Sequence, residues 1–419
     1  MARNYKEWLS LSHVHSYGSG AYSLLSASFR RVLPAYLTLL LWHTAWSITV
    51  TGPVLPLYIE AIGIGIIGWS ELSAVFALGM FLFEWVWGSL SDRIGRPFLM
   101  IASTLCMSLL FVLYASHGSF AFFMVLQLLS GAFGVIIAPT TRAYVSEEST
   151  GRSAGLYAGL WWVFFSLGRV IGPLIGTYIA QTWSFEYSFY ASSALSILTF
   201  FIIFMTFPRD RRGGEEARGI TEGLKTVGRS RSTRLLFLSA VFAFIGVSIV
   251  SSFLPLYASG QVGMSTVEVG TLVAVISAAQ LVAMPLVGWL ADRFGRKRTA
   301  TVGFFLSSCS FLLYFLAHTS YQVFLVSIAL GLGLSVISLL LAIIPDVTPS
   351  RMYGTVVGLY GSSEDLGIIV GPLVYGFVWS VSSPVYIFAA SSISQILSAV
   401  LVYALGQDNL QEAKAAYAR

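Results

Sequence analysis

Charged residues are scarce in this sequence: only 10% of its 419 residues are Asp, Glu, Lys or Arg, while 56% are hydrophobic. Soluble domains carry about 25% charged residues. An ordinary water-exposed surface is therefore excluded, and lipid must cover much of the chain. The formal net charge of +5 does not predict nucleic-acid binding, because the basic residues form no single patch along the sequence.

Cysteine is nearly absent, and the common catalytic motifs are missing. Cys106 and Cys309 both lie inside apolar segments, which excludes a disulfide framework and a zinc site. The sequence has no phosphate-binding Gly-Lys-Ser/Thr loop and no His-Glu-x-x-His motif. We therefore expect neither an enzyme nor a bound metal or cofactor. No signal peptide is predicted, since residues 1–33 are polar and rich in serine.

Long apolar segments are what the sequence has in abundance. A membrane-spanning helix needs about 20 apolar residues, and twelve such segments are predicted, at 35–59, 69–90, 98–116, 120–141, 156–181, 187–207, 235–258, 270–290, 299–317, 321–345, 355–381 and 385–405. We expect an all-α integral membrane protein. Its predicted parts are an N-terminal cytoplasmic segment (1–33), a six-helix bundle (34–207), a polar linker (208–234), a second six-helix bundle (235–406) and a tail (407–419).

Lys and Arg residues are distributed unequally among the loops. Of the 24, all but Arg142 and Arg169 fall in the terminal segments, the linker and the loops on the same side. Cytoplasmic loops carry an excess of Lys and Arg. Both termini are therefore predicted to be cytoplasmic, in a plasma or inner membrane.

The two halves of the chain share motifs at a fixed spacing. Leu55-Pro56-Leu57-Tyr58 recurs as Leu254-Pro255-Leu256-Tyr257, and the segment 88–96 recurs as 288–296, at offsets of 199 or 200 residues. Further matches pair Glu147 and Arg152 with Asp346 and Arg351, and Gly172-Pro173 with Gly371-Pro372. Matches in one register indicate an internal repeat, so the protein is predicted to be two related six-helix bundles.

The repeated motif Gly-x-Leu-x-Asp-Arg-x-Gly-Arg follows predicted helices 2 and 8, and it resembles that of the major facilitator superfamily along the whole chain. The resemblance implies two pseudo-symmetric bundles that alternate access to a midplane cavity lined by helices 1, 4, 7 and 10. In this family the motif acid of each half contacts the other half in the outward-facing state. The resemblance also implies ion pairs of Arg96 with Glu147 and of Arg296 with Asp346. The expected gating residues are Gly88, Asp92, Arg93, Gly95, Arg96, Glu147, Arg152, Gly288, Asp292, Arg293, Gly295, Arg296, Asp346 and Arg351.

Predicted helices 5 and 11 each carry glycines and a proline in a repeated pattern. The residues are Gly168, Gly172, Pro173 and Gly176 in the first, and Gly367, Gly371, Pro372 and Gly376 in the second. Glycines four residues apart let another helix pack closely, and the pattern resembles the signature of twelve-helix drug:proton antiporters. A hinge for antiport and plain helix packing are both open interpretations.

Ionisable and polar residues inside the apolar segments are candidates for coupling or substrate binding, because a charge at the bilayer centre costs about 3 kcal/mol. They are Glu84, Glu364, Asp365, Arg169, His43, Arg142, Gln127 and Trp46. A carboxyl group in a low-dielectric medium favours its protonated form, so the three acids could carry protons. Structural alternatives remain: an ion pair of Arg169 with an acid on predicted helix 8 or 11, a plain polar contact of His43, and an Arg142 side chain reaching the interface. Gln127 occupies the position where the antiporter branch usually has a proton-relay arginine.

These observations favour a secondary transporter that exports a small organic solute in exchange for protons. Its expected partners are that solute, protons and the lipid bilayer, and we expect a monomer. Uptake of an organic anion or a sugar-like solute is the first alternative, with Arg142 and Arg169 holding a negative charge. A non-transporting membrane sensor or scaffold is the second, although the sequence offers no long polar segment for an added soluble domain.

Overall fold

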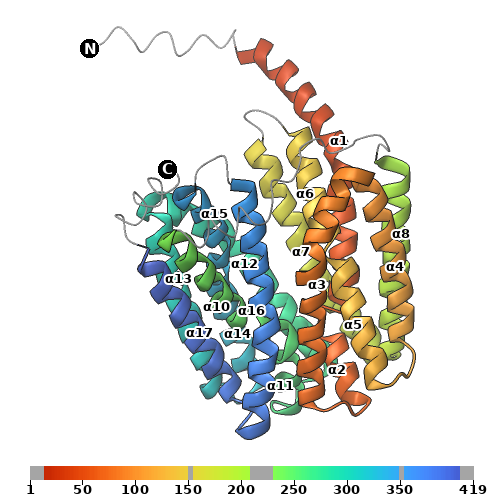
Figure 1. Cartoon of the computed structure of the whole chain (residues 1–419), viewed down its shortest axis with the longest axis vertical. Coiled ribbons are helices and arrows are strands. Elements are labelled where there is room, and N and C mark those ends of the chain that lie inside the picture. The colour runs from red at the N-terminus through yellow and green to blue at the C-terminus, as the bar shows by residue number, and fades with distance from the viewer. Residues whose placement is uncertain (1–13, 150–153, 208–229, 349–352, 406–419) are drawn as a thin grey trace.

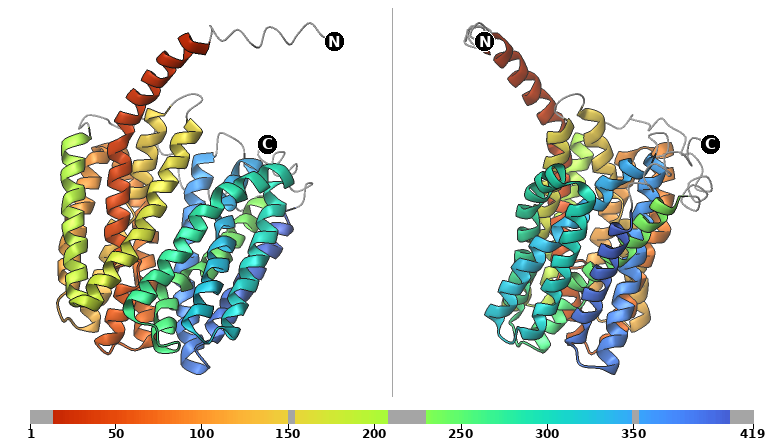
Figure 2. Two further views of the ribbon diagram at one scale, coloured as in Figure 1. Left: turned by 180° about the vertical axis from the view of Figure 1, so that it is seen from behind. Right: turned by 90° about the vertical axis from the view of Figure 1, so that its left-hand side faces the viewer.

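The computed structural model describes residues 14–149, 154–207, 230–348 and 353–405, apart from the side chains of 14–28, 89, 92, 93, 154, 354 and 355. Helices account for nearly all of this part of the chain, and they form two bundles that lie side by side (Figure 1, Figure 2). The predicted all-α membrane fold is therefore confirmed. Of the helices in the described ranges, eleven are long and apolar enough to cross a membrane.

The N-terminal half contains eight helices, which form the predicted spans 1 to 6. They are α1 (Val14–Ile48), α2 (Val54–Ala61), α3 (Ile66–Ile94), α4 (Arg96–Tyr114), α5 (Phe120–Gly134), α6 (Ile137–Glu148), α7 (Ala154–Thr182) and α8 (Phe185–Thr206). Within this half α1 packs against α7 and α8, α3 against α5, and α4 against α8.

The C-terminal half repeats this arrangement. Its elements are α10 (Arg231–Ser252), α11 (Leu254–Gly260), α12 (Thr266–Phe294), α13 (Arg296–Leu313), η3 (Tyr314–Leu316), α14 (Ser320–Leu334), η4 (Ser335–Ile337), α15 (Ser338–Val347), α16 (Tyr353–Val381) and α17 (Tyr386–Tyr403). Here α10 packs against α16 and α17, α12 against α14, and α13 against α17. Between the halves α3 contacts α16, and α7 contacts α12.

Several predicted continuous helices are interrupted in the structure. The fourth, expected at 120–141, is divided between α5 and α6, and the tenth, expected at 321–345, among α14, η4 and α15. The first, expected at 35–59, is divided between α1 and α2, and the seventh, expected at 235–258, is divided between α10 and α11. Between α1 and α2 the backbone at Gly52 lies so close to α1 that an added Cβ atom would meet the Ser47 carbonyl oxygen at 1.8 Å. Between α10 and α11, Pro255 follows the break, where a proline is tolerated in the first turn of a helix.

The first helix also begins earlier than the apolar pattern predicts. Residues 1–33 were expected to precede the helices, but α1 starts at Val14 and projects beyond the bundle (Figure 1). The start of α1 and the end of α17 lie on the same side of the molecule, which we call the terminal side; α2 and α11 lie on the opposite, distal side (Figure 1).

Candidate functional site

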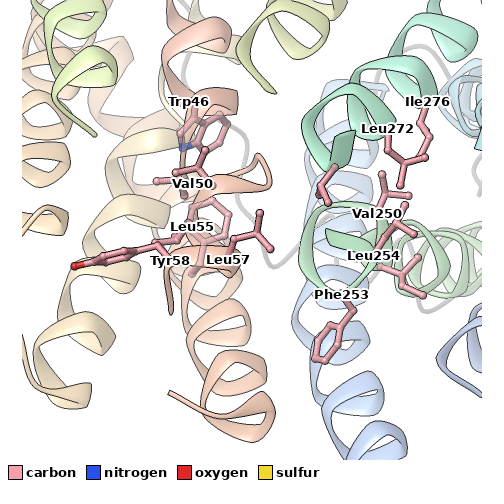
Figure 3. Packing of buried hydrophobic residues seen from close by; sticks show 14 of the residues in the cluster. Trp46, Val50, Leu55, Leu57, Tyr58, Val250, Phe253, Leu254, Leu272 and Ile276 are labelled. Carbon is pink, nitrogen blue, oxygen red and sulfur yellow. The ribbon is translucent and has the colours of Figure 1, made fainter. Parts of the chain in front are cut away.

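Apolar side chains join the two halves on the distal side. One continuous cluster of buried residues includes members of both halves. Figure 3 labels ten of them: Trp46, Val50, Leu55, Leu57 and Tyr58 from α1, α2 and the turn between them, and Val250, Phe253, Leu254, Leu272 and Ile276 from α10, α11, the junction between these two, and α12. The Trp69 indole nitrogen donates to the Ser252 carbonyl oxygen at 2.7 Å. The Val267 amide donates to the Gln181 side chain at 2.9 Å. These contacts close the distal side.

Glycines permit the closest approach between the halves, also on the distal side. A Cβ atom added at Gly270 of α12 would lie 1.8 Å from the Thr177 hydroxyl oxygen and 2.7 Å from the Pro173 carbonyl oxygen of α7. One added at Gly376 of α16 would lie 2.4 Å from the Ser70 Cβ atom of α3. Both inter-half helix pairs therefore contain a distal contact that a methyl group would obstruct.

Toward the terminal side, contacts between the halves continue along α3 and α16. Trp85 of α3 packs against the buried core of the C-terminal half, which forms a cluster distinct from the one that spans the halves on the distal side. The Asp292 side chain is exposed. A Cβ atom added at Gly155 or Gly159, in the terminal part of α7, would meet nothing within 4 Å. Among the described residues the distal side is thus closed by contacts of both helix pairs, whereas the terminal part of α7 has open space beside these two glycines.

The repeated gating motif forms the same turn in both halves. Gly95 and Gly295 end α3 and α12 with φ of 90° and 93°, a conformation that favours glycine. The two expected ion pairs are confirmed, between Arg96 and Glu147 at 2.6 Å and between Arg296 and Asp346 at 3.3 Å. Each pair ties the start of one helix to the end of another within its own half.

Other members of the motif have few contacts or are not described. At Gly88 and Gly288 an added Cβ atom would meet nothing within 4 Å. Arg293 lies over the Trp289 ring, 5.3 Å from its centre. Arg152 and Arg351 fall outside the described residues, as do the side chains of Asp92 and Arg93.

The glycine faces of α7 and α16 pack mainly within their own halves. Cβ atoms added at Gly168, Gly172 and Gly176 would lie 2.6–2.7 Å from atoms of α1. Those added at Gly367 and Gly371 would lie 2.5 and 2.0 Å from atoms of α10. These contacts support the packing interpretation, with Gly376 as the exception that meets the other half. Pro173 and Pro372 lie inside their helices.

Three acidic side chains gather where α3 of one half meets α16 of the other. The carboxyl groups of Glu84 and Asp365 lie within hydrogen-bonding reach of each other. Glu84 also lies against Gly361, where an added Cβ atom would be 3.2 Å from a carboxyl oxygen. Asp365 is 4% exposed, and one of its oxygens has no hydrogen-bond partner. Glu364, which is half-buried, interacts with Tyr360 one turn earlier.

Contacts one residue further along α3 hold this acidic cluster in place. The Trp85 indole nitrogen donates to the Ser362 hydroxyl at 2.9 Å. A Cβ atom added at Gly358 would lie 3.2 Å from the Trp85 ring. The sequence singled out the three acids separately but could not show that a contact between halves brings them together.

Arg142 extends from α6 toward these acids. Its guanidinium carbon lies 4.4 Å from the centre of the Trp161 ring and 5.2 Å from that of Trp162. Glu364 and Glu84 both act on it electrostatically. Arg142 is therefore stabilised by aromatic faces and by opposite charges, and it belongs to the acidic cluster.

Arg169 lies elsewhere, near the middle of the 29-residue helix α7. Its guanidinium carbon is 5.9 Å from the centre of the Phe165 ring. The other side of this neighbourhood is formed by His43 of α1, whose ring is 4.2 Å from that of Phe165. The structure thus pairs Arg169 with His43 and aromatic rings. The ion pair with an acid of predicted helix 8 or 11 is absent among the described residues.

Gln127 and Trp46 complete the candidates. Gln127 is buried inside the N-terminal half, where its carbonyl oxygen accepts a hydrogen bond from the Tyr114 hydroxyl at 2.9 Å. This contact accounts for its polar group and does not favour a relay role. Trp46 is 8% exposed and lies 5.9 Å from His43, ring to ring. Trp69, which suited a membrane interface by its sequence position, is instead buried between the halves.

Two similar helical bundles, closely packed at one end, with charged residues buried between them, define a multi-pass membrane transporter. The family model described as Major Facilitator Superfamily matches residues 37–235 and again 236–416. The chain belongs to this superfamily, and it is not an enzyme.

Relatives named "Multidrug resistance protein MdtG" are similar along most of the chain. The protein of Salmonella paratyphi A is 26% identical over 393 residues, covering 86% of this chain and 94% of its own. That of Klebsiella pneumoniae is 27% identical over 376 residues, covering 83% and 89%.

Solved structures share the fold at low identity. A bacterial homologue of the human lysosomal transporter Spinster, in an inward-facing and unoccupied conformation, is 14% identical with a TM-score of 0.70, covering 93% of this chain and 97% of its own. A D-xylose-proton symporter is 14% identical with a TM-score of 0.73, covering 90% and 98%.

Proposed function

We propose that this protein exports a small organic solute from the cytoplasm in exchange for protons, by alternating access. In this proposal the terminal side faces the cytoplasm, as the distribution of Lys and Arg predicts. The structure described above is then the state that is open toward the cytoplasm. The name of the relatives as multidrug resistance proteins supports export.

The observation that carries proton coupling is the carboxyl contact between Glu84 and Asp365, which joins the two halves. An ionised carboxylate accepts hydrogen bonds but donates none, so a hydrogen bond between two carboxyl groups requires a proton. Separation of α3 from α16 would break this hydrogen bond and expose each carboxyl group to the solvent that enters between the two helices. Proton binding and the movement of the halves are thereby linked at one place.

The proposal is tested in proteoliposomes that contain the purified full chain and a fluorescent drug such as ethidium. With the pH lower on the distal side, we expect ethidium to be moved toward that side and protons to move in the opposite direction. A reversed pH gradient should reverse the net movement of ethidium. Transport that ignores the gradient would refute proton coupling, and no transport of any of a panel of drugs would favour the sensor alternative.

The exposed motif acid provides a separate prediction about gating. In the alternate state, with the terminal side closed, we propose that Asp292 contacts the start of α7 in the other half, where helix dipoles favour negative charge. Asp292→Asn should therefore lower turnover by about fivefold, since the charge interaction is worth about 1 kcal/mol.

Drug binding at equilibrium should be nearly unchanged in this variant, because the site between the halves is intact. Ethidium flux and ethidium fluorescence titration measure the two quantities. Glu71→Gln, at an exposed carboxyl group on the distal part of α3, serves as the control and should retain flux. An Asp292→Asn variant with normal flux would show that this acid has no part in gating.

A further inference from the structure

Arg169 is a half-buried positive charge without a matching negative one among the described residues. It lies near the middle of α7 and forms no ion pair with any acidic residue among those described. A charge at that depth in a membrane costs about 3 kcal/mol. Such residues are normally paired or serve a functional site.

The comparison with Arg142 sharpens this point. Arg142 has two indole faces within 5.2 Å and is acted on by Glu84 and Glu364. The neighbourhood of Arg169 offers the Phe165 ring and His43, neither of which supplies a negative charge. The acids between the halves are thus associated with one arginine, and the other lacks a counter-charge.

Hydrogen-bonding groups beside Arg169 also lack partners. His43 is 3% exposed, and its Nε2 atom is buried with no hydrogen-bond partner. The Nε1 atom of Trp46, whose ring lies 5.9 Å from that of His43, is buried in the same way, and an indole N–H can only donate. A neutral imidazole donates from one of its two ring nitrogens. Leaving a buried polar group unsatisfied costs about 1–3 kcal/mol, so an acceptor from outside the chain would satisfy the indole and the tautomer of His43 that carries its proton on Nε2.

Helix packing fixes the relative positions of these groups. A Cβ atom added at Gly168 would lie 2.7 Å from the His43 Cβ atom, which sets α7 directly against α1 beside Arg169. A Cβ atom added at Gly134 would lie 2.6 Å from the Trp46 ring. The arginine, the imidazole and the indole are therefore held by rigid helix contacts, as a pre-organised binding site requires.

We propose that Arg169, His43 and Trp46 form a subsite for the oxyanion of a small organic anion, with Phe165 against its apolar body. A planar guanidinium binds carboxylate or phosphonate groups in a forked geometry. Such groups accept hydrogen bonds, which the orphaned donors lack. This inference rests on the proposed function and adds one class to its solutes: carboxylates, sulfonates and phosphonates that carry an apolar or aromatic part.

The test measures binding to the purified full chain in detergent without any gradient. The probes are benzoate, benzenesulfonate and phenylphosphonate, compared with neutral benzyl alcohol and cationic benzylamine, by thermal shift and tryptophan fluorescence. We expect saturable binding of at least one of the three anions and none of the other two probes. Arg169→Gln should weaken anion binding at least about tenfold, the scale of one lost charge-assisted hydrogen bond. Arg169→Lys keeps the charge but loses the forked geometry, so its affinity for the anions should lie between those of the unmodified chain and Arg169→Gln.

Arg231→Gln, at an exposed arginine at the start of α10, is the matched control and should bind as the unmodified chain does. The proposal is overturned if a folded Arg169→Gln variant binds the anions normally, if neutral and cationic probes bind equally well, or if none of the anions binds. Gradient-driven ethidium export by the unmodified chain, without any Arg169-dependent binding of the anions, would overturn this subsite alone. Arg169-dependent anion binding without proton-coupled transport would overturn the coupling alone.

Discussion

Replacing Gly376 by alanine is expected to prevent full closure of the distal side and to hold the protein open there. The added Cβ atom would lie 2.4 Å from the Ser70 Cβ atom and 2.5 Å from its hydroxyl oxygen. The Cβ atom of Ser70 is fixed by the backbone of α3, so a change of rotamer cannot relieve the overlap. Overpacking of this kind costs about 1–3 kcal/mol, which shifts the balance between two states by about 5- to 150-fold.

A compensating substitution makes this prediction specific. The next atom that the new methyl group would meet is the Ile66 carbonyl oxygen at 3.7 Å, an ordinary contact. Ser70→Gly in the same chain should therefore restore closure, because it removes both obstructing atoms. Rescue by the double variant would separate a gating contact from general damage to the fold.

Distances between spin labels measure the closure directly. After replacement of Cys106 and Cys309 by serine, labels at the exposed positions Ala61 and Gln261 report the separation of the distal ends of the two halves. Gly376→Ala should lengthen this distance and lower ethidium export at least about fivefold, and the double variant should return both to normal. Gly260→Ala, where the nearest atom would be 4.0 Å away, is the control. An unchanged distance between the labels in Gly376→Ala would contradict the prediction, because it would show that the distal side closes normally around the added methyl group.

The internal repeat explains why two glycine contacts exist, and the sequence contains this information in part. The offset of 200 residues relates Ser70 to Gly270, and the offset of 199 relates Thr177 to Gly376. Each contact joins a hydroxyl residue of the N-terminal half to a glycine of the C-terminal half. The equivalence of positions follows from the sequence, but the contacts depend on which side of the protein is closed, and no single sequence specifies one state of an alternating equilibrium.

Local features were predicted from the sequence better than contacts between distant helices. The pairing of Arg96 with Glu147 and that of Arg296 with Asp346 followed from the resemblance of the repeated motif, and both are present. The interruption between α1 and α2 was missed because an apolar segment looks the same whether its helix is continuous or broken. The early start of α1 was missed for the opposite reason, since its first residues have no apolar periodicity.

The candidate charges show where prediction from sequence stops. Depth along each helix identified Glu84, Asp365 and Arg169 as costly and therefore informative. Their partners depend on the rotation of each helix and on the packing of the two halves. The acids meet across α3 and α16, whereas Arg169 faces His43 within one half. Sequence alone left an arginine–acid pair open, and that pairing is absent from the described part of the chain.

Neutralising the carboxyl pair between the halves is expected to separate transport from the pH gradient. In Glu84→Gln with Asp365→Asn, amide groups can still hydrogen-bond across α3 and α16, so the fold and the contact should persist. Neither side chain can then bind or release a proton. The unmodified chain, exchanging one proton for each neutral solute, should build about a tenfold solute gradient for each unit of pH difference, since one unit corresponds to about 1.4 kcal/mol.

The double variant should build no solute gradient in response to pH, yet it should still equilibrate a labelled solute down its own gradient. Both rates are measured in the same proteoliposomes, with Glu71→Gln as a carboxyl control outside the cluster. If the double variant keeps its response to pH, the proton is carried elsewhere and the Glu84–Asp365 contact is structural. If it loses downhill movement as well, the pair is needed for the change of state itself. The single variants then tell whether the acid on α3 or that on α16 carries the proton. Replacing the proton-carrying acid should by itself abolish coupling, and replacing the other acid should not.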